Sequence, residues 1–343
     1  MKKISKLFWV LVVVVLLSNS GCVARWLAHR RSIDHYVTAM ALRSGNFNED
    51  AVLELQEAVN LNNQFGLAHS MLGDIYRESG QPEKAAEAYE NACQLDPWSF
   101  SDHFHLGEVY QVLERFSEAV EVLKRACQLQ PDHIESNYSL GMCYYEMQEY
   151  KQAEKFCTRA SELDPQNEEI FASLGNIYSK TGSDYKAINA YKQALEVKAD
   201  QPKVMVELGM VYIRMKRYGP GRLILEKAVE LAPDYVDAHV ALAFCLLKQN
   251  EYKPALLQYK YCLLLDEENC EALNGVGVVF MLLYMENPED KKLATDAIES
   301  WHRSLEIKPN QPKIEKLVQR YIKEFQSDDQ TDSLMPDGQD VTN

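Results

Sequence analysis

The sequence contains few residues whose types and spacing could carry out catalysis. Its 343 residues include no HExxH zinc-protease motif, no GxSxG nucleophile motif and no phosphate-binding Walker loop. Gly275-x-Gly277 begins like a dinucleotide-binding fingerprint, but Phe280 occupies the third glycine position. We therefore predict that the chain is not an enzyme and needs no cofactor.

Cysteine and histidine side chains could instead bind a metal ion. Seven cysteines follow Cys22, and they form neither a CxxC pair nor a zinc-ligand spacing: residues 93, 127, 143, 157, 245, 262 and 270. Most occupy positions where alanine, leucine or tyrosine recurs elsewhere, which favours small buried hydrophobic side chains. His69, His103 and His239 share one position of a repeat, and we interpret them as packed rings. The sequence thus predicts no metal site.

The charges are distributed unevenly along the chain. The formal net charge is −15, but residues 1–31 carry six basic and no acidic residues, so the remainder carries −21. Nucleic-acid binding needs clustered lysine and arginine to displace counterions from phosphates. Anionic lipid surfaces repel a strongly acidic body. We therefore expect no nucleic-acid partner, and membrane contact only through the N-terminus.

The N-terminus reads MKKISKLFWVLVVVVLLSNSGCVARW. Three lysines precede an apolar run from Leu7 to Leu17, and small and polar residues then lead to Cys22. A run of this length suits a signal-peptide core better than a membrane span, which needs about 20 residues. Residues 1–22 resemble a bacterial lipoprotein signal. This resemblance implies lipid attachment at Cys22 and, because Val23 is not aspartate, an outer-membrane lipoprotein that faces the periplasm.

Two other interpretations of this segment remain open. The run could be an uncleaved inner-membrane anchor, or cleavage after Ser20 or Ala24 could release a soluble protein. The odd number of cysteines after Cys22 fits an oxidising compartment poorly, which favours a body that faces the cytosol. The lipoprotein and the uncleaved anchor would both attach the chain to a membrane, whereas the cleaved soluble protein would not.

Leucine followed by glycine, or a close equivalent, returns every 34 residues without slippage. The small residue of this pair is Gly73, Gly107, Gly141, Gly175, Gly209, Ala243 and Gly277. An aromatic residue or leucine follows three positions later, alanine recurs twelve positions later, and most units end in proline. This pattern resembles the tetratricopeptide repeat, a pair of helices. Glycine within a helix costs about 1 kcal/mol relative to alanine, so we interpret each glycine as a notch for a neighbouring helix.

The resemblance implies an all-α fold, a superhelical solenoid of about eight stacked helix pairs with a C-terminal capping helix. The first unit is degenerate: Ala51, Leu55 and Ala58 keep its second helix in register, but its first helix is hard to align. The last unit carries eight extra residues around MENPEDKK. The expected organisation is a signal or anchor (1–22), a basic spacer (23–31), the repeats (32–310), the capping helix (311–325) and a disordered acidic tail (326–343).

In tetratricopeptide proteins the first helix of each unit lines a concave surface, and the resemblance implies which positions are exposed there. In the early units these positions are mixed, acidic and aromatic, whereas in the last units they form an apolar stripe. We predict partner binding at Val206, Met210, Ile213, Val240, Phe244, Leu247, Val278 and Met281. Exposed stripes of this kind usually mark contact sites. The alternatives are that the insert near residues 286–292 covers the stripe, or that it packs in a homodimer.

These patterns together predict a non-enzymatic, membrane-attached scaffold that binds peptides or helices of other proteins in its concave groove. The alternative is a regulatory or targeting subunit of an enzyme, anchored in the inner membrane with its repeats in the cytosol. No motif in the sequence selects one partner.

Overall fold

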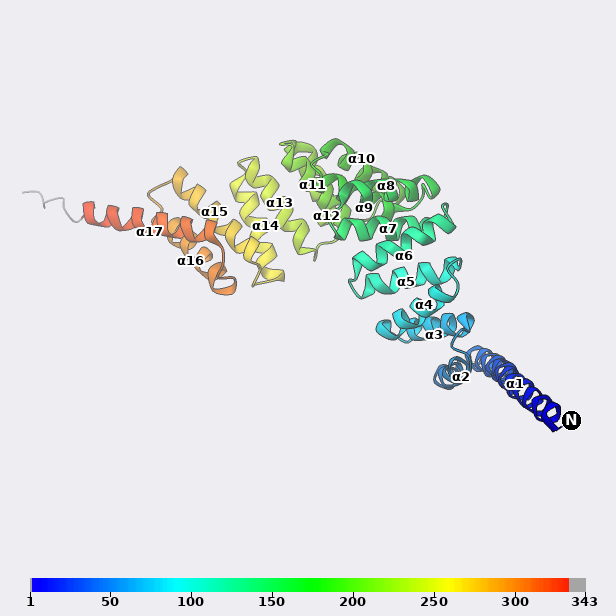
Figure 1. Ribbon diagram of the computed structural model, residues 1–343. Coiled ribbons are helices and arrows are strands. Elements are labelled where there is room, and N and C mark those ends of the chain that lie inside the picture. Colours follow the sequence, from blue (N-terminus) through cyan, green and yellow to red (C-terminus); the bar gives the residue numbers. More distant parts are fainter. Residues whose placement is uncertain (1, 333–343) are drawn as a thin grey trace, which may run out of the picture. The chain divides into compact units, whose positions relative to one another are not determined.

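The computed structural model describes the backbone of residues 2–332 and the side chains of residues 23–323. Residues 2–332 form α-helices joined by short turns, with no β-strand among them (Figure 1). The chain divides into two compact units, Met1–Pro165 and Gln166–Asn343. Each unit is a stack of helix pairs, which confirms the predicted all-α tetratricopeptide solenoid.

The helices of the first unit are α1 (Lys2–Ser44), α2 (Asn48–Leu61), α3 (Gly66–Glu78), α4 (Pro82–Leu95), α5 (Phe100–Val112), α6 (Phe116–Leu129), α7 (Ile134–Glu146) and α8 (Tyr150–Leu163). The helices of the second unit are α9 (Glu168–Lys180), α10 (Asp184–Val197), α11 (Pro202–Arg214), α12 (Tyr218–Leu231), α13 (Val236–Lys248), α14 (Tyr252–Leu265), α15 (Cys270–Glu286), α16 (Lys291–Ile307) and α17 (Pro312–Asp332). Each odd-numbered helix up to α15 pairs with the next helix. Within a unit, the second helix of a pair packs on the first helix of the following pair.

The turn inside each of the first seven pairs contains one residue in the left-handed conformation, again at intervals of 34. These residues are Asn46, Gly80, Glu114, Gln148, Gly182, Lys216 and Asn250. After Glu114, for example, the Arg115 N–H donates to the Tyr110 carbonyl at 2.8 Å, which closes a Schellman motif. The left-handed conformation costs residues other than glycine about 1–2 kcal/mol. Because these hydrogen bonds offset that cost, most of the turns need no glycine.

The glycines of the 34-residue pattern lie where a second helix comes closest. A methyl group at Gly209 would lie 2.6 Å from Cγ of Leu225, and one at Gly277 would overlap the indole of Trp301. Both large side chains are buried, and each comes from the second helix of the same pair. The interpretation of these glycines as packing notches is therefore confirmed.

The first repeat begins inside one long helix. α1 runs without a break from Lys2 to Ser44, so residues 23–31 are helical and do not form a separate spacer as expected. The last part of α1 packs on α2, and Ser32 and Ala39 are fully buried. Ala39 precedes Gly73 by one repeat length and occupies the same small-residue position. The side chain of Cys22 lies outside the described residues.

The last repeat is longer than the others at both helices. α15 and α16 contain 17 residues each, whereas α13 and α14 contain 13 and 14. The insert therefore adds about one turn to each helix, and residues 285–292 are exposed. α17 forms the predicted cap, with Val318 buried against α15 and α16. It continues past residue 325, so residues 326–332 are helical where a disordered tail was expected; residues 333–343 lie outside the described residues.

Candidate functional site

The second unit contains an open groove of about 820 Å³ along the first helices of three successive pairs, α11, α13 and α15. These first helices also contact one another, which aligns their exposed faces. The apolar residues of the groove are Val206, Met210, Val240, Phe244, Leu247 and Val278. The repeat therefore brings together side chains that are one or two repeat lengths apart in the sequence.

Six of the eight residues predicted for partner binding line this groove, and two do not. Ile213 is only 6% exposed, because α13 packs against α11 at that point. Met281 is only 3% exposed and packs with residues of α16 and α17. The expectation of exposure is wrong for these two side chains and also for Val206, which lines the groove but is only 8% exposed. Met210 is the most open of the predicted residues, with 39% exposure.

Part of the stripe is covered, although by a different segment from the one expected. No described residue of the insert lines the groove, whereas Val278 and Met281 belong to an apolar cluster with residues of α16 and α17. Ile314 and Leu317 of α17 belong to the same apolar cluster. The capping helix thus closes one end of the groove and leaves the part along α11 and α13 open.

Charged side chains surround the apolar floor. Asp237 and Glu271 lie in the first turns of α13 and α15, and Glu207 lies on α11; all three are exposed. Lys248 is the last residue of α13, and its Nζ lies 5.0 Å from the centre of the Phe244 ring. Asp237 and Lys248 are therefore about 16 Å apart along the helix. The groove is acidic where α13 begins and basic where it ends.

Three polar groups of the groove were missed by sequence reasoning. Tyr235 precedes α13, Lys248 ends it, and Lys313 comes from α17. Burial, then the charge of Asp237 and a hydrogen bond to its carboxylate, and last the charge of Glu207 raise the pKa of Tyr235 to about 12. Its hydroxyl therefore stays protonated at neutral pH, with its single proton directed to Asp237. The place of Tyr235 directly before a repeat helix could have indicated its role, and Lys313 follows Pro309 by four residues as Asp237 follows Pro233.

One polar atom at the groove lacks a partner. The side-chain N–H of Asn274 donates to Oε1 of Gln311 at 2.7 Å, and its backbone carbonyl accepts from Nε1 of Trp301 at 3.2 Å. Oδ1 of Asn274 is buried, and no described residue donates to it. An unpaired buried acceptor costs about 1–3 kcal/mol.

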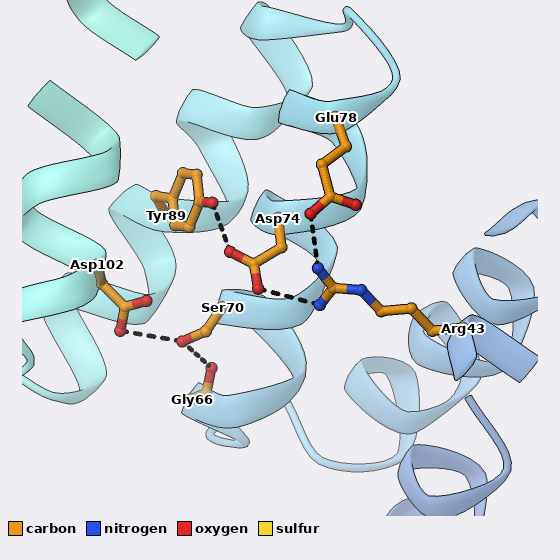
Figure 2. Close-up of polar contacts among 7 residues, drawn as sticks. All are labelled: Arg43, Gly66, Ser70, Asp74, Glu78, Tyr89 and Asp102. Atoms are coloured by element: carbon orange, nitrogen blue, oxygen red, sulfur yellow. Dashed lines mark hydrogen bonds and ion pairs between the residues drawn. The ribbon is translucent and has the colours of Figure 1, made fainter. Parts of the chain in front are cut away.

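The first unit has a polar surface at the equivalent helices. Figure 2 shows Arg43 of α1 between two carboxylates of α3, with its Nη atoms 3.0 Å from Asp74 and 2.8 Å from Glu78. The Tyr89 hydroxyl donates to the second oxygen of Asp74 at 2.7 Å. Burial, followed by this hydrogen bond, raises the pKa of Tyr89 well above its usual range. The network ties α1 to α3 and leaves Asp74 engaged on both oxygens.

A second carboxylate in this region is almost fully buried. Asp102 is 6% exposed, and the Ser70 hydroxyl lies within hydrogen-bond distance of it at 2.9 Å (Figure 2). The same hydroxyl also reaches the Gly66 carbonyl at 3.1 Å, so its single proton serves one acceptor at a time. This cluster is a structural network between neighbouring repeats.

The cysteines and histidines behave as packing residues. Cys143, Cys157, Cys245 and Cys262 are fully buried, and burial raises their thiol pKa values to about 11–12. They therefore remain protonated, poor nucleophiles at neutral pH. The three histidines at the shared repeat position are also buried, as interpreted from the sequence. Among the described residues, no group of three or more histidine, cysteine and acidic side chains could hold a metal ion.

Helix pairs with a 34-residue repeat, small-residue notches and a groove on their first helices define a tetratricopeptide-repeat protein. The comparison with known families agrees with this assignment. The chain belongs to the family described as the Cilia and flagella-associated protein 70 C-terminal domain, whose model matches residues 39–274. No curated protein sequence matches the chain.

Several solved structures resemble the chain. The structure described as the APC/C hetero-tetramer Cut9-Hcn1 aligns with a TM-score of 0.54 and 17% identity, over 80% of this chain and 52% of that one. YrrB, described as a TPR protein with an unusual peptide-binding site, aligns with a TM-score of 0.49 and 21% identity, over 54% and 95%. The MamA protein aligns with a TM-score of 0.47 and 25% identity, over 48% and 91%. The first of these likenesses supports the fold alone.

The helices were also compared with the length that a bilayer requires. Within the segment whose side chains are described, residues 23–323, no helix is both long and apolar enough to cross a membrane. The apolar run from Leu7 to Leu17 lies outside that segment.

Proposed function

We propose that this protein is a non-enzymatic scaffold that binds a segment of another protein in the groove of α11, α13 and α15. The observation that carries the proposal is the apolar floor itself, formed by six side chains from three successive repeats. A soluble domain rarely leaves such a concave apolar surface without a ligand. Methionine and aromatic side chains are also typical of grooves that adapt to peptide ligands.

The charges around the floor indicate the chemistry of the partner. Asp237, Glu271 and Glu207 have no ion-pair partner among the described residues, and all are exposed. A cationic side chain would therefore be attracted to the end of the groove where α13 and α15 begin. The segment that fits is amphipathic: apolar side chains contact Phe244 and Val240, and lysine or arginine follows at the acidic end.

Phe244→Glu is expected to weaken binding at least about 100-fold, because it places a carboxylate against apolar groups of the ligand. The probe is a random displayed-peptide library, selected on the full chain and counter-selected on the variant. Enriched peptides should combine large apolar residues with lysine or arginine and should bind wild type by fluorescence anisotropy. Phe244 is only partly buried, so the circular-dichroism melting curve should barely change.

The matched control is Tyr185→Glu, which places the same charge at an aromatic side chain that is 76% exposed and outside the groove. It should bind the selected peptides like wild type. Peptides that bind Phe244→Glu and wild type equally would contradict the proposal, as would enrichment of acidic sequences.

We also propose that the N-terminus attaches the protein to a membrane. The support is the apolar run between Leu7 and Leu17 and the basic residues that flank it. The attachment could be a lipid on Cys22 or an uncleaved anchor. Mass spectrometry of the mature N-terminus from membrane fractions distinguishes these two possibilities. A lipid mass on Cys22 is expected for an outer-membrane lipoprotein, whereas an intact Met1 terminus would favour an anchored regulatory subunit with its thiol-containing repeats in the cytosol. A chain cleaved after Ser20 or Ala24 and absent from membranes would contradict both possibilities.

A further inference from the structure

The outer helix of the seventh repeat, α14, has an exposed apolar face. Leu257, Tyr261 and Leu264 are 67%, 38% and 81% exposed. Their spacing of four and three residues places them on one side of the helix. The Tyr261 ring lies 4.6 Å from the ring of His239, so this side chain is held in place from α13.

Other repeats are polar at the same positions. The residues equivalent to Tyr261 and Leu264 in the second to sixth repeats are Asn91, Gln94, Arg125, Gln128, Arg159, Glu162, Gln193, Glu196, Lys227 and Glu230. The residue equivalent to Leu257 is charged or asparagine from the second to the fifth repeat, and it is leucine again at Leu223 in the sixth. The fold therefore does not require apolar side chains here. Something else must account for them.

The charges at the two ends of this face are opposite in sign. Lys253 lies four residues before Leu257, and Glu268 lies four residues after Leu264. Both charged side chains are exposed, and neither has an ion-pair partner among the described residues. Lys253 and both leucines lie on α14, whereas Glu268 follows the last residue of that helix, Leu265, in an acidic turn with Asp266 and Glu267.

We propose that this face binds a second copy of the same chain, with the two α14 helices antiparallel about a two-fold axis. In that arrangement Leu257 of each copy meets Leu264 of the other, and Tyr261 lies near the axis. Lys253 of each copy meets Glu268 of the other, so the apolar and charged contacts form together. An isologous interface requires this kind of self-complementarity.

Other occupants fit the face less well. A lipid surface would meet Asp266, Glu267 and Glu268 directly after the helix, and anionic headgroups repel such a cluster. An unrelated helix could cover the leucines, but it would not explain the opposite charges at the two ends of the face. The groove proposed for partner binding lies on the first helices of the repeats, so dimerisation through α14 leaves that groove open.

Sedimentation velocity of the full chain, in a mild non-ionic detergent that disperses the N-terminal run, tests the proposal. Wild type is expected to form a dimer at micromolar concentration. Leu257→Glu and Leu264→Glu should each raise the dimer Kd by about 100-fold, because each places two carboxylates at the centre of the interface. The matched control is Leu53→Glu, at the equivalent position of the first repeat and 61% exposed, which should remain dimeric.

A charge exchange tests the antiparallel arrangement. Lys253→Glu and Glu268→Lys should each weaken the dimer by about tenfold, and the double variant should restore it, because each pair is re-formed with reversed sign. A wild-type monomer, or a dimer that persists in both leucine variants, would overturn the proposal. A monomer that binds neutral phosphatidylcholine vesicles through Leu264 would also overturn it, in favour of a lipid contact.

Discussion

Gly209→Ala is expected to destabilise the second unit by about 2–3 kcal/mol, because the new methyl group overlaps a packed side chain. Its Cβ would lie 2.6 Å from Cγ of Leu225, and 2.7 Å from one of its Cδ atoms. Leu225 is fully buried between α11, α13 and its own helix, so it has no free space to move into. Urea unfolding followed by circular dichroism measures the loss.

A double-mutant cycle shows whether this overlap is the cause. Leu225→Ala alone should cost about 2–5 kcal/mol through the cavity it creates. In the Gly209→Ala, Leu225→Ala double variant the new methyl group meets no leucine and fills part of that cavity. The double variant should therefore be at least about 1 kcal/mol more stable than the sum of the two single losses.

Gly219→Ala is the matched control on the neighbouring helix. It lies in the first turn of α12 with a helical φ, and a methyl group there would have no neighbour within 4 Å. Alanine should stabilise this position by up to about 1 kcal/mol, because it favours the helix and restricts the unfolded chain. Equal effects of Gly209→Ala and Gly219→Ala would show that helix propensity, and not the notch, explains the glycines.

Trp301→Ala is expected to cost about 3–5 kcal/mol, since it empties the largest fully buried side-chain site. The indole fills the notch at Gly277 and donates to the Asn274 carbonyl at 3.2 Å. It also stacks on Tyr321 of the capping helix, with ring centres 6.0 Å apart. Its removal should release α17 from the last repeat.

Hydrogen exchange with mass spectrometry can locate this effect. Contacts in a repeat array are made between neighbours, so the loss should be local. Protection should fall in α15, α16 and α17 and stay unchanged in α3 to α6. Trp98→Ala, at a tryptophan that is 74% exposed, should cost less than about 1 kcal/mol and change exchange only near residue 98. A uniform loss of protection along the chain would contradict this account.

The sequence by itself determined the repeat and its internal packing. From Gly73 to Gly209, each glycine of the 34-residue pattern meets a side chain 16 residues later, as Gly209 meets Leu225, and the insert lengthens this interval to 24 residues between Gly277 and Trp301. Such contacts form within one helix pair, so their spacing can be read directly. The buried cysteines follow for the same reason, because they stand at positions that repeat as alanine, leucine or tyrosine.

Only the tertiary structure decided which parts of the stripe are open. Met210 and Ile213 are three residues apart, yet they are 39% and 6% exposed. Met281 matches the pattern of an open position and is covered by a helix that follows the repeats. Exposure depends on what packs over a side chain from elsewhere in the chain, and a repeat pattern does not contain that information.

Contacts with segments from elsewhere in the chain also explain two polar features of the groove. Lys313 enters it from the capping helix, and Gln311, just before that helix, accepts the side-chain N–H of Asn274, whose Oδ1 has no partner among the described residues. These contacts join segments outside any one repeat. Local periodicity therefore determined the fold and the floor of the groove, whereas packing between non-equivalent segments decided its boundaries and its polar contacts.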